Sequence, residues 1–332
     1  MWDSVVGHEQ NKAFLANFLT AQARPHALLF SGGEGLGKKQ LALAFAKTLL
    51  CLHQRGEDSC ESCRLLNFRE GNFSHPDFIL LQRYEDKTEI LIEQIRNLIS
   101  QAAFAPVLSS HKVCIIEDAD KMNINAANSF LKLLEEPPAG WVIILLATKE
   151  EALLPTILSR VVTLRFHPVS LVEVEEHLAR LGIGQTQAQV LARLSEGSIG
   201  LARRLQDEDV WDYRKVAWEL IQALPLSTPL NYIAEVQWVE KYTRQEALLL
   251  LKLLQLLLRD MLFVRSGLRF NLYNCDWQQD LTEQAQQWSL SGLTRALKVV
   301  NGAHRALQSN AGVKLVLEAC VIQIDTIRKE IR

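Results

Sequence analysis

The first candidate for chemistry in this sequence is a glycine-rich segment that ends in two lysines. Residues 32–39 read Gly-Gly-Glu-Gly-Leu-Gly-Lys-Lys, which fits the phosphate-loop pattern G-x-x-x-x-G-K but has Lys39 where Ser or Thr is expected. Glycines allow backbone N–H groups to turn toward a phosphate, and Lys38 would neutralise part of its charge. The alternative is a plain glycine-rich turn with a lysine at its end. The pattern predicts phosphate-loop ancestry but casts doubt on ATP binding, because the hydroxyl that would bind Mg²⁺ is missing. The nucleotide-binding candidates here are Gly32, Gly35, Gly37, Lys38 and Lys39.

Two adjacent acids are the second candidate. Glu117 and Asp118 follow the apolar run at residues 113–116. Acids at the exit of a buried strand are where phosphate-loop proteins hold Mg²⁺ and orient a water molecule. The usual order, Asp before Glu, is reversed here, and acids at strand exits are also common in solvated loops. The pair indicates nucleotide chemistry only in combination with the glycine-rich segment.

Three of the six cysteines form a cluster in the sequence. Cys51, Cys60 and Cys63 lie within 13 residues, and structural zinc takes four tetrahedral Cys or His ligands. His53, His75 or water would fill the fourth position, and the alternative is three ordinary thiols. An independent zinc-based nucleic-acid module is disfavoured, because the segment is short and not basic enough. The cluster predicts a structural Zn²⁺ site with an incomplete ligand set and, with the other cysteines, a reducing compartment.

These residues must be positioned by an alternation of short apolar runs and amphipathic helical patterns. Strands are expected at residues 26–31, 77–81, 112–117, 142–147 and 161–165. Helices are expected between them at residues 39–50, 92–103 and 123–136. Strands that alternate with helices predict a parallel sheet covered on both faces, which is an α/β fold.

After Pro168 the strand signals stop and the pattern is helical. Ser170 and Glu173 form a capping box that opens one helix, and two more are expected at residues 185–195 and 199–205. Helical patterns continue from residue 208, with breaks at Pro225, Pro229, Gly267 and Gly292. The predicted domains are an α/β domain at 1–167 with a Cys-rich insertion at 51–66, a small helical lid at 168–207 and an all-α domain at 208–332.

Composition narrows the classes of function. The 332 residues include 36 Lys plus Arg and 38 Asp plus Glu, so the formal charge is −2 and an autonomous, charge-driven nucleic-acid binder is disfavoured. The first residues are acidic where a signal peptide would be basic. The most apolar stretch, residues 247–264, is interrupted by four charged or amide side chains and predicts a buried helix, not a membrane span. These features predict a soluble, cytoplasmic protein.

Several ordered motifs carry a family resemblance. Residues 117–122 read Glu-Asp-Ala-Asp-Lys-Met, and residues 126–138 read Ala-Ala-Asn-Ser-Phe-Leu-Lys-Leu-Leu-Glu-Glu-Pro-Pro. Together with Leu-Ala-Thr at 146–148, Leu-Ser-Arg at 158–160, His-Pro-Asp at 75–77 and the clustered cysteines, they resemble bacterial clamp-loader subunits of the AAA+ class. The similarity covers about residues 5–205, and residues 208–332 match only in length and helical character. The resemblance implies an AAA+ parallel-sheet domain, a lid and a C-terminal collar that holds a ring together, and it makes Thr148 a nucleotide-binding residue.

Three departures from the family pattern distinguish among its subunits. Hydrolysing gamma/tau subunits have Thr or Ser at the position of Lys39 and an arginine at that of Gly200, and Glu117 also differs from the usual acid. The resemblance therefore implies a non-hydrolysing stator that assembles with gamma/tau and delta subunits to place a sliding clamp on primed DNA. DNA-directed DNA polymerase activity, and with it the nucleotidyltransferase class, would belong to the holoenzyme. The alternative is a catalytically active AAA+ ATPase, either gamma/tau-like or another DNA-associated remodeller.

The resemblance also assigns two further sites. Ser159 and Arg160 would supply an arginine finger to ATP bound by the neighbouring subunit; otherwise, Arg160 is a surface arginine at a helix-to-strand junction. The family's four-cysteine zinc cluster would place its fourth ligand at residue 66, which is leucine here.

Overall fold

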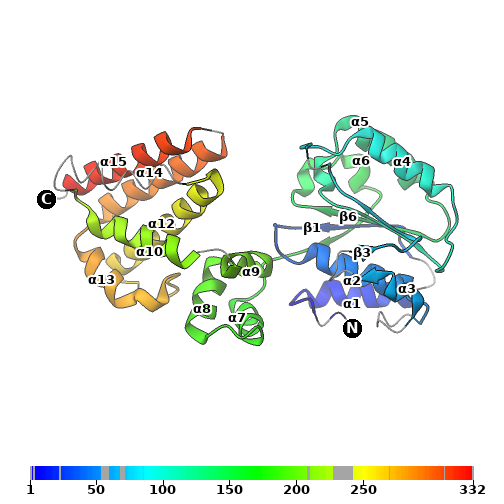
Figure 1. Ribbon diagram of the computed structural model, residues 1–332, viewed down its shortest axis with the longest axis horizontal. Helices are drawn as coiled ribbons and strands as arrows, with labels where there is room; N and C mark the ends of the chain where they lie inside the picture. Colours follow the sequence, from blue (N-terminus) through cyan, green and yellow to red (C-terminus); the bar gives the residue numbers. More distant parts are fainter. Residues whose placement is uncertain are drawn as a thin grey trace. The chain divides into compact units, whose positions relative to one another are not determined.

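The computed structural model describes residues 2, 4–21, 24–53, 60–67, 72–84, 86–207, 210–226, 242–268, 270–309 and 311–330, and Figure 1 shows its helices and strands. The chain divides into two compact units. The first consists of residues 1–180 and 195–202, and the second of residues 181–194 and 203–332.

The first unit is built on the predicted parallel sheet. Its strands are β1 (Ala27–Ser31), β4 (Phe78–Leu81), β5 (Lys112–Ile116), β6 (Trp141–Ala147) and β7 (Val162–Arg165). They are hydrogen-bonded in the order β4-β5-β6-β1-β7, and each neighbouring pair is parallel. Every residue of β1, β5 and β6 is buried, which explains why these strands are continuous apolar runs rather than alternating ones. The five predicted strands are confirmed.

Helices cover both faces of this sheet (Figure 1). One face is covered by α1 (Glu9–Thr20) and α2 (Lys38–Leu50), and the other by α4 (Ile92–Ala102), α5 (Ile124–Glu135) and α6 (Pro155–Leu158). Alternate residues of β1 divide between the two cores, because side chains of a strand point to opposite faces. Leu28 and Phe30 pack with α1 and α2, whereas Ala27 and Leu29 pack with α4 and α5. The three predicted helices of this region are confirmed, and α1 and the short α6 are additions to them.

The Cys-rich insertion after α2 and the residues that follow it contain short elements that the sequence did not predict. They are α3 (Glu61–Arg64) and an antiparallel pair formed by β2 (Leu66–Asn67) and β3 (Asn72–Phe73).

Three helices follow the sheet, as predicted, at α7 (Leu171–Arg180), α8 (Gln185–Leu194) and α9 (Ile199–Asp207). The capping box is confirmed, since Ser170 N donates to Glu173 Oε2 over 3.1 Å and Glu173 N donates to Ser170 Oγ over 3.3 Å. The start of α9 and all of α7 belong to the first unit, and α8 belongs to the second. The boundaries of the three predicted domains stay a prediction.

The described part of the second unit is built from helices. Besides α8 it contains α10 (Val210–Ala223), α12 (Arg244–Arg265), the short η4 (Cys275–Trp277), α13 (Gln278–Gln286), α14 (Leu290–Gln308) and α15 (Val313–Lys329). The apolar stretch at 247–264 lies within α12, which contacts α10, α13 and α14. Among the helices that the structure describes, none has both the length and the apolar character needed to cross a membrane.

One predicted helix break is wrong. Gly292 lies in the first turn of α14, where its N–H donates to the Ser289 Oγ over 3.0 Å. The helix therefore begins at the Ser289 cap, and a glycine in the first turn does not end it. Gly267 does follow the end of α12, in the left-handed region at φ +85°. Pro229 lies outside the described residues.

Candidate functional site

The carboxyl ends of three neighbouring strands bring the predicted nucleotide-binding residues together. The glycine-rich loop follows β1, Glu117 and Asp118 follow β5, and Thr148 follows β6. The Gly32 N–H donates to the carbonyl of Ala147 over 3.2 Å, which joins the loop to the end of β6. In open α/β sheets this edge is where ligands bind. We call residues 32–39, 117–120 and 148 the phosphate-loop edge.

Lys38 is held by the loop to which it belongs. Its Nζ donates to the carbonyls of Gly32 and Gly33 over 2.6 and 2.7 Å. Burial lowers the pKa of Lys38, and the negative charge of Asp120 opposes this shift. In a working phosphate loop this ammonium contacts the β- and γ-phosphates. A phosphate would here have to compete with two carbonyls of the same chain.

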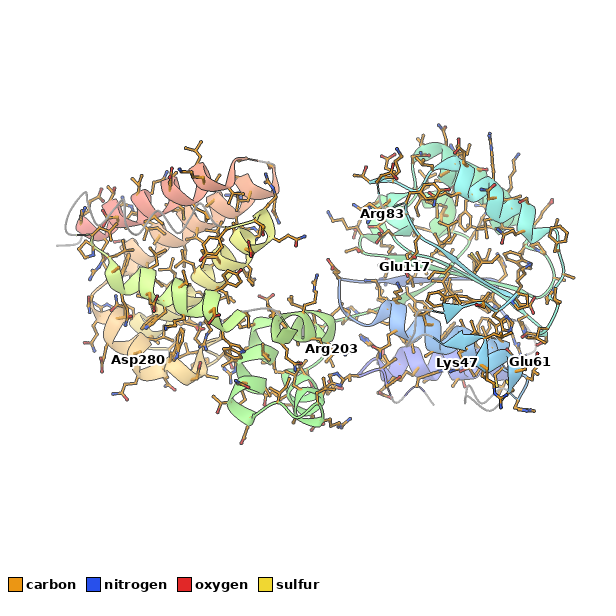
Figure 2. All side chains as sticks on the ribbon, in the orientation of Figure 1. Lys47, Glu61, Arg83, Glu117, Arg203 and Asp280 are labelled. Carbon is orange, nitrogen blue, oxygen red and sulfur yellow. The ribbon has the colours of Figure 1, made fainter. Side chains whose placement is uncertain are left out.

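Glu117 and Asp118, two acids of the phosphate-loop edge, are paired with side chains of their own chain. The Lys39 Nζ lies 2.6 Å from the Glu117 Oε1, and the Gln82 Nε2 donates to the Glu117 Oε2 over 3.0 Å. The Arg83 Nε donates to the Asp118 Oδ2 over 2.8 Å, and Figure 2 shows Arg83 and Glu117 at the same end of the sheet. Mg²⁺ needs oxygen ligands such as carboxylates and a loop hydroxyl. The chain instead places an ammonium group against Glu117.

A backbone contact joins the glycine-rich loop to the start of α9. The Gly200 N–H donates to the Gly35 carbonyl over 2.8 Å, and the Ser198 Oγ donates to the Glu34 carbonyl over 3.2 Å. A Cβ atom at Gly200 would lie 2.8 Å from the Gly35 Cα, and one at Gly35 would lie 2.4 Å from the Ser198 Oγ. Gly35 also has φ +73°, in the left-handed region that favours glycine. We call Gly35, Ser198 and Gly200 the glycine contact. It gives Gly200 a packing role that the sequence did not reveal.

Ser159 and Arg160 lie at the other end of the strands, where the parallel strands begin. They precede β7, which runs parallel to β1, with Leu28 beside Val162 and Ser31 beside Arg165. A strand rises about 3.3 Å per residue, so the start of β7 lies roughly 10 Å from the end that meets the phosphate loop. We call the start of β7, together with Ser159 and Arg160 before it, the arginine edge. The structure does not bring Arg160 to the nucleotide-binding candidates of its own chain.

The Arg160 guanidinium is held by three acceptors. Its Nη2 donates to the Glu135 Oε1 over 2.9 Å, and its Nη1 donates to the Thr156 carbonyl over 3.0 Å and the Ser159 Oγ over 3.1 Å. The side chain remains 36% exposed. Among the described residues, the Arg160 Nε–H has no hydrogen-bond acceptor. The guanidinium is thus oriented by its own chain and still accessible.

The three clustered cysteines meet in space. The Sγ atoms of Cys51, Cys60 and Cys63 all lie within 4.8 Å of one another, those of Cys51 and Cys60 are 3.8 Å apart, and all three residues are buried. Burial raises the pKa of the Cys63 thiol. Zinc binds thiolates at about 2.3 Å, which places tetrahedral sulfur ligands roughly 3.8 Å apart. The cluster therefore fits three ligands of a structural zinc ion, and the buried Leu66 supplies no fourth.

The structure argues against His75 as the fourth ligand. Its Nδ1 accepts from Asp77 N over 3.0 Å, and its Nε2 lies 2.8 Å from the Ser62 Oγ. Because Nδ1 is an acceptor, Nε2 carries the proton and donates to Ser62, which in turn donates to the Leu50 carbonyl over 2.5 Å. This is a buried structural network and does not activate Ser62 as a nucleophile. His53 is exposed and outside the cluster.

Sequence reasoning missed the partners of the site residues. Glu135 lies within the motif at residues 126–138, but no local pattern shows that it meets Arg160, which lies 25 residues further along the chain. Ser198 and Glu34 are separated by 164 residues. Only the packed fold brings such pairs together.

The parallel sheet with its phosphate loop and the helices that follow define the AAA+ class. A DNA polymerase III gamma subunit-related protein from Thermotoga maritima has a similar fold, with a TM-score of 0.53 and 19% sequence identity over 96% of this chain and all of that one.

Family models narrow the assignment. The model for the DNA polymerase III delta subunit matches residues 7–170, and the model for its C-terminal part matches residues 208–326. The DNA polymerase III delta' subunit of Bacillus subtilis is 31% identical over 93% of this chain and 94% of its own length. That of Pseudomonas aeruginosa is 33% identical over 63% of this chain and 66% of its own length. The chain belongs to the DNA polymerase III delta' subunit family.

Proposed function

We propose that the chain is a non-hydrolysing stator of a clamp-loader complex, in which it assembles with gamma/tau and delta subunits to place a sliding clamp on primed DNA. Membership of the delta' family supports this proposal. The observation that carries it is the contrast between the two edges of the sheet. At the phosphate-loop edge, Lys39 and Arg83 pair with the two acids, Glu117 and Asp118, that would otherwise face Mg²⁺. At the arginine edge, the contacts within the described residues engage only Nη1 and Nη2 of Arg160, so its Nε–H stays available.

Arg160 acts in this proposal on ATP bound by a neighbouring subunit. A guanidinium stays charged at all relevant pH values and can donate two parallel hydrogen bonds to phosphate oxygens. It can therefore stabilise the charge that develops during phosphoryl transfer. The position of Arg160, at the opposite edge from the phosphate loop of its own chain, supports action in trans and not in cis.

The phosphate loop has a structural role in this proposal. Lys39 takes the place of both the missing hydroxyl and the Mg²⁺ that it would hold, because its ammonium pairs with Glu117. In this proposal Gly200 replaces the arginine with which hydrolysing subunits read the γ-phosphate, and its close contact with Gly35 supports a packing role instead. The loop then serves as a docking surface for the start of α9.

Residues 208–332 would form the oligomerising collar. Two large apolar side chains on α15, Leu315 and Ile322, are 72% and 45% exposed, and they lie two helical turns apart on one face. An exposed apolar face on a helix supports a contact with another subunit. We assign the protein to the cytoplasm, and any nucleotidyltransferase activity to the complete polymerase assembly.

We also propose that Cys51, Cys60 and Cys63 bind a structural zinc ion. Their Sγ spacing supports this proposal. Protein purified without metal-binding tags or chelators should contain close to one equivalent of zinc, and Cys63→Ser should lose most of it, while Cys320→Ser, a buried cysteine outside the cluster, should retain it. Because structural zinc binds tightly, less than about a tenth of an equivalent in the unmodified chain would refute the site.

The proposed function is tested by reconstituting the clamp loader with Arg160→Ala. We expect assembly to be unchanged and the stimulated ATP turnover to fall partially, because other interfaces keep their own arginines. At the affected site alone the loss should be on the order of 10³-fold. Arg165→Ala is a matched control, since Arg165 is also paired with a glutamate, Glu150, but lies at the other end of β7. Unchanged ATP turnover and clamp loading with Arg160→Ala would reject the finger, and failure to assemble would show a structural role instead.

A further inference from the structure

The last residue of α5 meets the arginine edge. The Glu135 Oε1 accepts a hydrogen bond from the Arg160 Nη2 over 2.9 Å. The two side chains are 50% and 36% exposed. Exposed ion pairs contribute little to folding stability, so stabilisation of the fold does not explain this contact.

The fold fixes the backbone of Glu135 firmly. Helix α5 begins at the Asn123 cap, whose side chain accepts from Ala126 N over 2.9 Å, and it ends before Pro137 and Pro138. Phe130 on this helix is fully buried against the sheet. The carboxylate therefore projects from a rigid helix end.

Glu135 completes a three-point hold on a long, flexible side chain. The Thr156 carbonyl and the Ser159 Oγ both take hydrogen bonds from Nη1, and they belong to the same short segment as Arg160. Glu135 is the acceptor for Nη2, and it comes from a different helix. Without it, both remaining acceptors would hold the same nitrogen, and the guanidinium plane would be free to swing about them.

We propose that Glu135 is a positioning residue for the arginine finger. It holds the Arg160 guanidinium in one orientation while the Nε–H remains available to an incoming phosphate oxygen. This inference rests on the proposed function of Arg160. Pre-organised donors are the effective ones in phosphoryl transfer, because they need no rearrangement as charge develops.

The neighbouring glutamate provides a matched control. Glu136 is also exposed and directly follows Glu135, but among the described residues no contact joins its side chain to Arg160. Replacement of either glutamate by alanine removes the same charge from the same end of α5. A difference between the two variants therefore reports on the contact and not on net charge.

The experiment uses a reconstituted complex in which the subunit next to this chain is the only one able to hydrolyse ATP. Glu135→Ala should lower the stimulated kcat about tenfold and leave the KM for ATP unchanged, since a displaced donor affects chemistry more than binding. Glu135→Gln should restore part of the rate, because the amide oxygen still accepts from Nη2. Glu136→Ala should match the unmodified complex.

A double variant separates this inference from the proposed function. If Glu135 acts through Arg160, then Glu135→Ala should cause no further loss in an Arg160→Ala chain. Independent, multiplying losses would overturn the positioning role, as would an unchanged or faster rate with Glu135→Ala alone while Arg160→Ala is slow. An unaffected rate with Arg160→Ala would instead reject the finger itself, and the positioning role with it. Size-exclusion chromatography confirms that every variant assembles.

Discussion

Charged side chains are paired at both edges of the sheet, but the pairing leaves different groups available to another molecule. At the phosphate-loop edge, Lys38 donates to two carbonyls of its own loop, and Lys39 pairs with Glu117. At the arginine edge, Arg160 is oriented by Glu135 and remains 36% exposed. Pairing at the phosphate-loop edge thus takes up Glu117, which would otherwise face Mg²⁺, whereas pairing at the arginine edge orients a guanidinium and, among the described residues, leaves its Nε–H available.

Helix dipoles act on cations in opposite directions at the two edges. Helix α2 begins at the phosphate-loop edge, where the positive end of its dipole repels cations. The bonds of Lys38 to two carbonyls and of Lys39 to Glu117 offset this repulsion. Helices α5 and α6 end at the arginine edge, and their negative ends favour the Arg160 guanidinium. An arginine is therefore stable at this edge without being buried.

The largest expected effect concerns catalysis by the isolated chain. It should hydrolyse ATP at least about 10³-fold more slowly than a working clamp-loader ATPase, because it lacks the Mg²⁺ hydroxyl and receives no arginine from a neighbour. Lys39→Thr alone should not restore turnover, because Gly200 still stands where hydrolysing subunits have an arginine. Steady-state phosphate release measures this. Turnover comparable to a working subunit, and abolished by Lys38→Ala, would erase the difference between the edges and favour the active ATPase.

A smaller effect is expected when the glycine contact is crowded. Gly200→Ala places a Cβ 2.8 Å from the Gly35 Cα and should lower the free energy of unfolding by about 1–3 kcal/mol. Gly302→Ala, also within a helix, meets no atom within 4 Å and should raise it by roughly 0.5–1 kcal/mol. Urea unfolding monitored by circular dichroism measures both variants. Equal effects of the two substitutions would show that the packing at the phosphate-loop edge is loose.

The smallest effect is a pH dependence at His111, which directly precedes β5. The His111 Nε2 lies 3.0 Å from the Arg24 Nη1, and burial, followed by the Arg24 charge, lowers the pKa of His111. The unfolded state then binds more protons than the folded state, so stability is complete above the ordinary histidine pKa of about 6.5 and declines as the pH falls below it.

We expect His111→Gln to reduce this decline by about 1 kcal/mol or less between pH 7.5 and 5.5. The amide oxygen of glutamine can still accept from Arg24 but does not titrate. Unfolding free energies at the two pH values, compared with those of the unmodified chain, give the difference. Identical declines would mean that His111 titrates normally and that the Arg24 pairing does not persist in solution.

Local patterns in the sequence were sufficient for the elements of the sheet and for the altered motif positions. Strands of five to seven buried residues appear as nearly unbroken apolar runs, so β1, β5 and β6 were predicted to within a residue. The replacement of a hydroxyl by Lys39 is visible because a phosphate loop has a fixed spacing. The break expected at Gly292 failed, because a glycine in the first turn of a capped helix has the same local sequence signal as a glycine at a helix end.

The tertiary structure alone decided how these residues are paired. The order β4-β5-β6-β1-β7 separates Arg160 from its own phosphate loop, and no local pattern encodes that order. Gly35 follows the first strand of the sheet and Gly200 comes after the last one, yet the two are in contact. Glu135 meets Arg160 from a different helix. Local propensity reflects the interactions of a residue with its near neighbours in the chain. These contacts depend on where packing of the two hydrophobic cores places whole helices, so they exist only once the sheet and its covering layers have formed.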